Sequence, residues 1–567
     1  MNQTVRLAGW VDAIRDHGGV LFIDLRDHYG VTQAVIQPEN FGAAARALGR
    51  EYVITVEGVL RERDPETVNP KIATGDVEVK AASMEILSET SRPIPFEISE
   101  SLKTREEVRL IYRFLDLRNP LMHEKIVLRS KVIRFLREKM QDLGFLEIQT
   151  PILTSSSPEG ARDYLVPSRK FRGKFYALPQ APQQFKQLIM TAGFDKYFQI
   201  APCFRDEDAR ADRSPGEFYQ LDFEMAFACQ EDVFSVTETV LYDTFRTFAE
   251  GKEITAPPFP RVPYAESMLK YGTDKPDLRN PLMIEDLSDY FSAVDFMPFK
   301  NKPVRGIVAP ACSSKPKSFF EKMLAFALDI GMKGLGYISV LADMELKGPI
   351  VKFLSAEKQR ELIERLRLKE DDTLFFISDA PKTVDRLAGQ IRTELGGRLE
   401  LIRENQFAMC FITDYPMYGR NEDTGQIEFT HNPFSMPQGG MEALQSKDPL
   451  EIKAYQYDIV CNGVELSSGA VRNHRPDVML KAFEIAGYTR RDIEEKFSAL
   501  FEAFHYGAPP HAGMAPGVDR TLMLLTGAES IREVIAFPMN SNGQDLLLKA
   551  PGVVTEQQLR EAHIKIR

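Results

Sequence analysis

Phe204-Arg205-Asp206-Glu207-Asp208 follows a mostly apolar run at 197–203, and more than 300 residues later the chain reads Gly517-Val518-Asp519-Arg520. The apolar run predicts a buried strand, and residues 521–525 predict a helix that Arg520 opens. A guanidinium is always charged, and its planar fork of donors fits carboxylate and phosphate groups. Each arginine therefore needs an anionic partner, which is either a structural carboxylate or a bound ligand.

Three upstream stretches narrow that choice. They are Gly144-Phe145 to Thr150-Pro151, Ser157-Pro158-Glu159-Gly160-Ala161-Arg162-Asp163 and Gln183-Gln184-Phe185-Lys186-Gln187. The stretch at 144–151 and the two arginine strings resemble, in this order, motifs one, two and three of class II aminoacyl-tRNA synthetases. The strings at 157–163, 183–187, 204–207 and 517–520 resemble the bacterial-type aspartyl-tRNA synthetases of that class. This resemblance covers nearly the whole chain and implies an antiparallel-sheet catalytic core.

The bulk composition fits a multidomain globular protein. A chain of 567 residues is too long for one hydrophobic core, and 43% hydrophobic with 27% charged residues are ordinary proportions. The net charge is −11, and the first 90 residues hold 9 basic against 14 acidic side chains. Overall charge therefore argues against nucleic-acid binding, so any RNA contact must use local patches.

The sequence predicts neither a membrane span nor export, because it contains no 18-residue apolar run and no basic-then-apolar leader. Its five cysteines are odd in number, and no two have the spacing of zinc ligands. They are Cys203, Cys229, Cys312, Cys410 and Cys461. Reduced thiols in a cytoplasmic protein are the expected state.

The first 90 residues predict a small β-barrel. Residues 20–26 and 31–36 alternate with period two, residues 41–49 are Ala-rich and helical, and 52–61 and 76–81 predict further strands. Over residues 4–90 the prediction is three strands, a helix and two strands, which is the element order of the five-stranded OB-fold that binds oligonucleotides in many proteins. A generic small β-domain is the alternative.

The predicted fold is α+β and multidomain, with an N-terminal OB-fold barrel, a class II antiparallel-sheet core and an α/β insertion domain. Residues 1–90 would bind the anticodon, and 91–122 would form a hinge that is irregular up to 119. A helix at 123–143, ending at Gly144, opens a catalytic core that carries the first two motifs at 123–275. Residues 276–405 predict the insertion found in bacterial members. Residues 406–567 complete the core with the third motif and a C-terminal tail.

The resemblance implies that ATP is a substrate and that no protein nucleophile is needed. The aspartate α-carboxylate would attack the α-phosphate of ATP, and the aspartyl group would then pass to the 3′-terminal ribose of tRNA. Catalysis would be positioning and charge neutralisation, with Arg205 on the α-phosphate and Arg520 on the γ-phosphate. The implied ATP-binding residues are Arg205, Asp206, Glu207, Ser214, Glu465, Gly517, Val518, Asp519 and Arg520. Glu207 would accept from the adenine amino group, and Ser214 departs from the glutamine that relatives often carry there.

Asp458 and Glu465, seven residues apart around Asn462-Gly463, resemble the family's Mg²⁺ carboxylates. Magnesium commonly takes one or two carboxylates together with phosphate oxygens, which fits this pair. Either acid alone could equally be a solvated surface carboxylate.

A further set of residues would select aspartate. By resemblance they are Glu159, Gln183, Lys186, Arg205, Gln220, Asp222, His431 and Arg472. Lys186 and Arg472 would face the side-chain carboxylate of the substrate, so the amide of asparagine would leave both cations unpaired. Asp222 and Glu159 would oppose the substrate ammonium, with Gln183 and Gln220 bridging. His431 begins His431-Asn432-Pro433-Phe434, and Asn432 departs from the second histidine that is usual in the family.

The resemblance places tRNA recognition in the barrel. Phe22 would stack on a base, while Arg15, Gln33 and Glu78 would read base edges. His17 matches the histidine of relatives that charge both tRNA(Asp) and tRNA(Asn), and Glu66 stands where a lysine accompanies selectivity. The implied enzyme is a non-discriminating one, which requires an amidotransferase to convert aspartyl-tRNA(Asn).

Pro151 ends the segment that packs across the dimer interface in class II enzymes, so the resemblance implies a homodimer. A proline that simply ends a strand is the alternative. Other functions remain open at this point: a strictly discriminating aspartate–tRNA(Asp) ligase, an asparaginyl- or lysyl-tRNA synthetase, a small-molecule asparagine synthetase, and a catalytically inactive RNA-binding relative. The cations Lys186 and Arg472 favour an acidic amino acid, and both motif arginines favour an active enzyme.

Overall fold

A computed structural model describes residues 2–156, 160–209, 211, 213 and 216–566 of the chain. The chain separates into two compact units, one ending at Glu124 and the other beginning at Lys125. Across the described ranges, the helices are either too short or too polar to cross a membrane.

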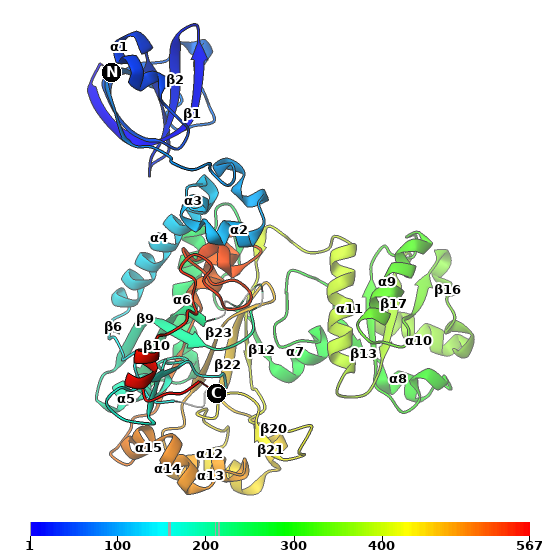
Figure 1. The fold of residues 1–567 in the computed structure, drawn as a ribbon. Coiled ribbons are helices and arrows are strands. Elements are labelled where there is room, and N and C mark those ends of the chain that lie inside the picture. Colours follow the sequence, from blue (N-terminus) through cyan, green and yellow to red (C-terminus); the bar gives the residue numbers. More distant parts are fainter. Residues whose placement is uncertain (1, 157–159, 210, 212, 214–215, 567) are drawn as a thin grey trace. The chain divides into compact units, whose positions relative to one another are not determined.

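The first unit contains a closed β-barrel (blue in Figure 1) with strand order β1-β2-β3-β5-β4. The strands are β1 (Thr4–His17), β2 (Val20–Arg26), β3 (Val31–Ile36), β4 (Val53–Glu62) and β5 (Val77–Ser88). Alternate apolar residues such as Val11, Ile23 and Val56 fill its interior. The predicted five-stranded barrel is therefore confirmed. The helix predicted at 41–49 lies earlier, at α1 (Pro38–Arg46), because the fixed φ of Pro38 suits the first helical turn.

The segment that follows the barrel is more regular than the sequence predicted. Residues 91–119 contain three short helices: η2 (Ile98–Lys103), α2 (Glu106–Ile111) and α3 (Arg113–Asp116). Asp116 is fully buried and pairs with Arg109 at 3.1 Å and with Arg113 at 2.5 Å. This buried charge pairing, made between residues seven and three positions apart, orders a stretch whose local sequence looked irregular. The next helix, α4 (Pro120–Asp142), is followed by Gly144 at a φ of 80°, which suits a helix stop.

The second unit is built on an eight-stranded sheet with the order β12-β19-β22-β23-β24-β10-β9-β6. Its strands are β6 (Leu146–Glu147), β9 (Lys196–Arg205), β10 (Gly216–Ala226), β12 (Arg261–Pro263), β19 (Met409–Thr413), β22 (Gln456–Cys461), β23 (Val464–Val471) and β24 (His511–Met514). The central strands are antiparallel, as predicted for the core. Apolar side chains from α4, α6 (Gln230–Phe248) and α16 (Val518–Thr526) cover one face, so the opposite face is left for polar groups.

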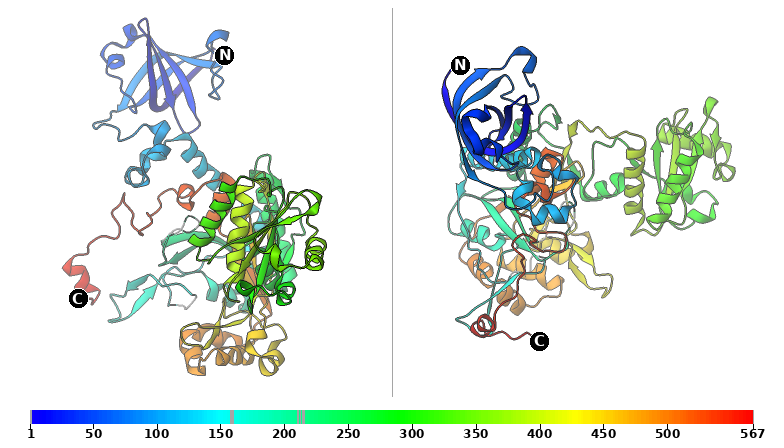
Figure 2. Two further views of the ribbon diagram at one scale, coloured as in Figure 1. Left: turned by 90° about the vertical axis from the view of Figure 1, so that its right-hand side faces the viewer. Right: turned by 45° about the horizontal axis from the view of Figure 1, so that its top comes forward.

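A separate five-stranded antiparallel sheet lies within residues 284–378 (green in Figures 1 and 2), in the order β13-β14-β17-β15-β16. The strands are β13 (Ile284–Asp286), β14 (Val304–Ala309), β15 (Gly336–Val340), β16 (Leu346–Lys347) and β17 (Thr373–Ser378). Helix α11 (Val384–Arg398) packs across β14 and β17. The sheet has apolar cores of its own, as expected of an insertion.

The remaining α-helices and strands connect or flank these sheets. They are α5 (Gln183–Thr191), α7 (Tyr264–Tyr271), α8 (Ser288–Ser292), α9 (Lys317–Asp329), α10 (Ala356–Leu366), α12 (Gly440–Ser446), α13 (Pro476–Ile485), α14 (Arg490–Lys496), α15 (Ser498–Phe504), α17 (Glu556–Glu561), β7 (Leu165–Pro167), β8 (Phe175–Ala177), β11 (Glu253–Ile254), β18 (Gln406–Phe407), β20 (Tyr418–Arg420) and β21 (Ile427–Phe429).

Candidate active site

A cavity of about 700 Å³ opens on the polar face of the eight-stranded sheet. It is lined by most of the residues that the sequence singled out for aspartate and ATP. These are Gln183, Lys186, Arg205, Glu207, Gln220, Asp222, His431, Glu465, Arg472, Gly517, Asp519 and Arg520. Residues far apart in the sequence therefore meet around one volume large enough for a substrate.

Strand β10 supplies the floor of the cavity through its period-two alternation. Leu221 and Phe223 point into the apolar core, so the alternate residues Gln220, Asp222 and Glu224 face the other side. Asp222 and Glu224 are both fully buried. Two adjacent buried carboxylates are costly unless cations accompany them.

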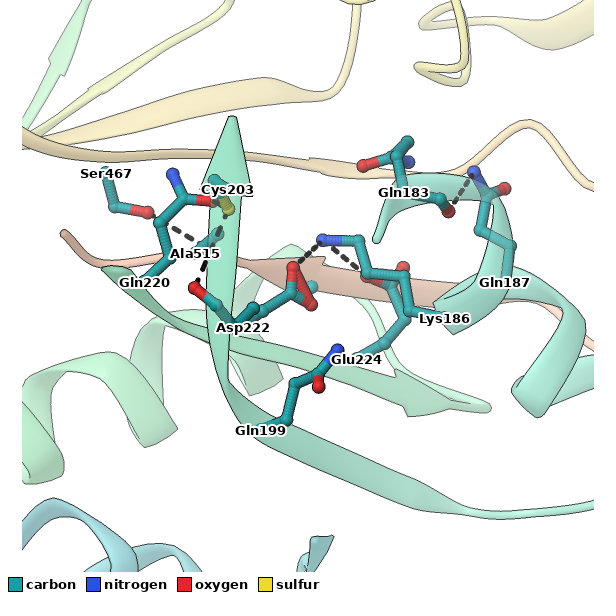
Figure 3. Close-up of polar contacts among 12 residues, drawn as sticks. Gln183, Lys186, Gln187, Gln199, Cys203, Gln220, Asp222, Glu224, Ser467 and Ala515 are labelled. Carbon is teal, nitrogen blue, oxygen red and sulfur yellow. Dashed lines mark hydrogen bonds and ion pairs between the residues drawn. The ribbon is translucent and has the colours of Figure 1, made fainter. Parts of the chain in front are cut away.

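The required cations are Lys186 of α5 and Arg472, which directly follows β23. Figure 3 shows Lys186 together with Asp222 and Glu224. Lys186 Nζ lies 2.9 Å from Asp222 Oδ2 and 3.6 Å from Glu224 Oε2. The Arg472 guanidinium donates to the two carboxylate oxygens of Glu224 at 2.8 and 3.1 Å. The four side chains form a buried quartet with no net formal charge.

The quartet is incomplete on its cavity side. Asp222 Oδ1 and Gln183 Nε2 are buried and have no hydrogen-bond partner among the described residues. Burial raises the pKa of Asp222 even though Lys186 opposes the shift. Burial also acts against ionisation of Glu224, but Arg472 and Lys186 outweigh it and lower the Glu224 pKa. Asp222 therefore has both the free oxygen and the electrostatic need for a further cation, such as a ligand ammonium.

Arg205 ends β9 and lines the same cavity. Its guanidinium carbon lies 5.0 Å from the centre of the Phe218 ring, and its Nε is buried without a hydrogen-bond partner in the described part of the chain. The aromatic face holds the charge in place without neutralising it. An arginine in this state suits an anionic ligand.

Arg520 reaches the same cavity from the first turn of α16. Its Nη1 donates to the backbone carbonyl of Glu465 at 2.6 Å, which fixes the side chain beside that carboxylate. Asp519 is occupied by internal contacts, since it pairs with Arg129 and accepts from the Tyr219 backbone N–H at 2.8 Å. Val518 packs into the apolar core and does not line the cavity.

Asp458 and Glu465 lie on neighbouring strands of the β22–β23 hairpin, whose turn residues Asn462 and Gly463 have φ values of 53° and 81°. Tyr415 donates to Asp458 Oδ2 at 2.6 Å, while Asp458 Oδ1 is buried without a partner among the described residues. Burial, followed by the nearby Glu465, raises the pKa of Asp458 to about 7.

A divalent cation fits this pair. The described residues contain no cluster of three or more His, Cys, Asp or Glu side chains arranged for a metal ion. Two carboxylates suffice for magnesium when substrate phosphates and water supply the other ligands. The buried oxygen of Asp458 has no hydrogen-bond partner among the described residues, and its carboxyl pKa is raised. A bound cation would pair with that oxygen and stabilise the ionised carboxylate.

The other predicted residues occupy varied positions. His431 packs its ring 4.8 Å from that of Tyr415, and burial lowers its pKa. Glu207 pairs with Arg213, whereas Asp206 exchanges backbone contacts with Arg162 and does not line the cavity. Glu159 and Ser214 lie outside the described residues, so the structure does not place them.

The barrel brings its predicted residues together on adjacent strands. Gln33 pairs with Glu78 across β3 and β5, and its amide donates to the Glu78 carboxylate at 2.9 Å. Arg15 donates to Gln33 at 3.2 Å and to both oxygens of Asp24 at 2.7 Å. Phe22 lies opposite Arg15 across β1 and β2. Asp24, which the sequence did not single out, therefore orients Arg15.

His17 and Glu66 are both exposed. The His17 ring lies edge-on to Phe22, with a centroid separation of 5.6 Å. Glu66 sits in the short helix η1 (Pro65–Thr67). His17 therefore shares a surface with the predicted stacking residue.

Three buried or ion-paired residues were missing from the sequence prediction: Glu224, Tyr415 and Lys275. Glu224 could have been predicted from the sequence, because it continues the polar alternation of Gln220 and Asp222. Lys275 lies 3.2 Å from Glu465, and Tyr415 donates to Asp458; both contacts join segments far apart in the sequence. No local pattern marks either residue.

Comparisons with known proteins agree with this geometry. A family model described as tRNA synthetases class II (D, K and N) matches residues 105–541, and one described as an OB-fold nucleic acid binding domain matches residues 5–87. The asparaginyl-tRNA synthetase of Pyrococcus horikoshii, solved with asparaginyl-adenylate, has a similar fold. The TM-score is 0.58, with 95% of each chain covered and 19% identity.

Several bacterial relatives are similar over the full length of this chain. The aspartate–tRNA(Asp/Asn) ligase of Acidiphilium cryptum is 55% identical, covering 99% of this chain and 95% of that protein. That of Paramagnetospirillum magneticum is also 55% identical, but this chain spans only 64% of its length. The aspartate–tRNA ligase of Streptomyces coelicolor is 53% identical, with 99% and 96% covered. The chain belongs to the class II tRNA synthetases of the D, K and N group.

Proposed function

We propose that this protein is an aspartate–tRNA(Asp/Asn) ligase. It activates L-aspartate with ATP to aspartyl-adenylate and transfers the aspartyl group to tRNA(Asp) and tRNA(Asn). The observation that carries the proposal is the buried quartet, in which Lys186 and Arg472 line the cavity beside the unpartnered oxygen of Asp222. Such a site matches an amino acid that carries both an ammonium and a second carboxylate. The names of the full-length relatives support the same function.

In the first step, an oxygen of the aspartate α-carboxylate attacks the α-phosphorus of ATP and pyrophosphate leaves. Arg205, on the face of Phe218, holds the α-carboxylate and α-phosphate together, and Arg520 holds the γ-phosphate. Asp222 and Gln183 hold the ammonium end, and Gln220 and His431 line the cavity nearby. By resemblance, Glu159 would also oppose the ammonium. Because no protein nucleophile takes part, the rate depends on orientation and charge stabilisation.

The adenine of ATP would be held near Glu207 and Asp206, with Gly517, Val518 and Asp519 shaping the turn into α16. By resemblance, Ser214 would also contact ATP. Asp458 and Glu465 would hold Mg²⁺. A bound Mg²⁺ ion neutralises phosphate charge and so favours departure of pyrophosphate. In the second step, a hydroxyl of the terminal ribose of tRNA attacks the aspartyl carbonyl and AMP leaves.

The barrel selects the tRNA by its anticodon. Phe22 offers a stacking face, and Arg15, Gln33 and Glu78 offer donors and acceptors to unstacked bases. His17 and Glu66 favour acceptance of tRNA(Asn) as well as tRNA(Asp). The protein would act in the cytoplasm as a homodimer, and an amidotransferase would be needed to convert its aspartyl-tRNA(Asn).

The alternative is a strictly discriminating ligase that charges tRNA(Asp) alone. The Streptomyces relative, at 53% identity, is named an aspartate–tRNA ligase without stating which tRNAs it charges, so its name does not decide between the two hypotheses. The deciding experiment is charging of purified tRNA(Asp) and tRNA(Asn) with radiolabelled aspartate and, separately, asparagine. Charging of both tRNAs with aspartate supports the proposal, and charging of tRNA(Asp) alone supports the alternative. Charging with asparagine, or the absence of any charging, contradicts both.

A further inference from the structure

Lys275 contacts the candidate metal site from a segment that was not expected to reach it. The residue follows α7 in the stretch that leads from the catalytic sheet into the inserted domain. Its Nζ lies 2.9 Å from Asp274 Oδ2 and 3.2 Å from Glu465 Oε2. An ammonium group therefore sits directly on a carboxylate that would hold Mg²⁺.

The position of Lys275 is fixed by its surroundings. The buried Ser267 hydroxyl donates to the Thr273 carbonyl at 2.7 Å, and the Lys275 backbone N–H donates to the Thr273 hydroxyl at 3.1 Å. On the other side, the turn at Gly463 is so close that an added Cβ would meet Asp277 Cβ at 3.4 Å. The segment is thus held against the very hairpin that carries Asp458 and Glu465.

The charges around Lys275 are mainly negative. The carboxylates of Asp274 and Glu465 both pair directly with its ammonium group. Arg520 is the other cation near Glu465, with Nη1 3.8 Å from Oε1, but its hydrogen bond goes to the Glu465 backbone carbonyl. Lys275 is therefore the closest cationic partner of the Glu465 carboxylate in the described part of the chain.

We propose that Lys275 is the counter-ion of the metal-binding hairpin, and that it lowers the affinity of Asp458 and Glu465 for a divalent cation when ATP is absent. This inference rests on the proposed function, which assigns Mg²⁺ to that pair. The ammonium and a divalent cation compete for Glu465 Oε2, and they repel each other at the separation that sharing one carboxylate imposes. Phosphate oxygens of ATP add ligands and negative charge, so they shift the balance towards the metal ion. Metal binding is thereby coupled to ATP binding.

The test is a titration of the full-length protein with Mn²⁺ in the absence of ATP, followed by electron paramagnetic resonance of free Mn²⁺. Lys275→Met should bind one Mn²⁺ at least about tenfold more tightly than the unmodified protein, because a repelling charge has been removed. Lys275→Arg keeps the charge and should behave like the unmodified protein. Lys270→Met is a matched control, since among the described residues Lys270 forms an ion pair only with Glu266 on the same helix, α7.

Two further measurements make the result decisive. Adding Glu465→Gln to Lys275→Met should abolish the extra affinity, which separates this site from other acidic groups on the protein. Lys275→Gln serves if the methionine variant does not fold by circular dichroism. The inference is overturned if removal of the Lys275 charge leaves Mn²⁺ binding equal or weaker, or undetectable. Failure of the proposed function would show separately, as the absence of aspartate-dependent pyrophosphate exchange by the unmodified enzyme.

Discussion

Glu224 accepts a hydrogen bond from Arg472 Nε at 2.8 Å, and it does so from behind the wall of the cavity. Arg472, Lys186 and Asp222 line the cavity, whereas Glu224 does not. Glu224 also lies 3.6 Å from Lys186 Nζ, so one hidden carboxylate contacts both cations that would meet the substrate. It can therefore orient the cations without touching the ligand.

Glu224→Gln should weaken aspartate binding far more than ATP binding. The glutamine NH₂ group would point a donor at an Arg472 donor and remove the charge that holds both cations. Breaking a buried ion pair costs roughly 3–5 kcal/mol, which corresponds to about 10² or more in kcat/KM for aspartate. Pyrophosphate exchange measured against both substrates checks this, with Glu217→Gln on an exposed position of β10 as control. Equal losses for ATP and aspartate would point to general damage of the site.

Lys186→Met tests the cation that pairs with Asp222 at 2.9 Å. The variant should raise the KM for aspartate and reduce the preference for aspartate over asparagine, because only Arg472 would remain to face the side-chain carboxylate. The expected loss is roughly 3–5 kcal/mol in kcat/KM for aspartate. Competition between the two amino acids in adenylate formation measures the preference. An unchanged KM for aspartate would place the amino-acid pocket elsewhere.

The sequence predicted the parts of this site that follow local patterns. The arginines at the end of β9 and at the start of α16 lie where expected, because strand and helix periodicity position them directly. Gln220 and Asp222 alternate with apolar residues along β10, a pattern that was not used as a prediction. Glu224 carried the same alternation, but a sequence does not show which face of a strand meets a cation from another helix. The roles of Lys275 and Tyr415 could not be predicted from the sequence, since their contacts depend on how distant segments pack. The short helices at 98–116 were missed for a different reason. Asp116 pairs with arginines only seven and three residues away, but the sequence does not show that these charges are buried together.

Arg205→Ala and Arg520→Ala should each reduce aspartate-dependent pyrophosphate exchange by roughly 10²–10³, because each removes a charge aimed at the transferring phosphates. Circular dichroism should remain unchanged. Arg491→Ala is a suitable control, since that side chain is 85% exposed and its ion pair within the described ranges is with Glu495 on the same helix. Near-normal exchange in either variant would remove that arginine from the phosphate site.

Arg15→Ala should impair tRNA charging while leaving pyrophosphate exchange unchanged. Arg15 belongs to the first unit of the chain, whereas the residues of the catalytic cavity belong to the second. Loss of one base contact should cost ~1–3 kcal/mol in kcat/KM for tRNA, by analogy with base readout in DNA. Asp24→Asn should give a smaller loss of kcat/KM for tRNA, because it removes the carboxylate that accepts two hydrogen bonds from Arg15 and orients it. Arg61→Ala, on an exposed position of β4, controls for general charge. A parallel fall in pyrophosphate exchange would contradict a role confined to tRNA.

The surface of the barrel around Phe22 should determine whether the enzyme discriminates between tRNA(Asp) and tRNA(Asn). The anticodons for aspartate and asparagine differ only in a cytosine against a uracil at the third position, so discrimination must come from a few local contacts. The His17 ring lies edge-on to Phe22, with 5.6 Å between the ring centroids, and so lies next to the base on which Phe22 would stack. Glu66 adds a negative charge in an exposed short helix. We expect the unmodified enzyme to charge both tRNAs with kcat/KM values within about tenfold of each other. His17→Leu and Glu66→Lys should each lower charging of tRNA(Asn) relative to tRNA(Asp), by up to ~1–3 kcal/mol. Glu62→Lys, an exposed charge reversal on β4, should leave the ratio unchanged. A preference for tRNA(Asp) above about a hundredfold, which is ~2.7 kcal/mol, would make the unmodified enzyme strictly discriminating and would leave the aspartate pocket as described.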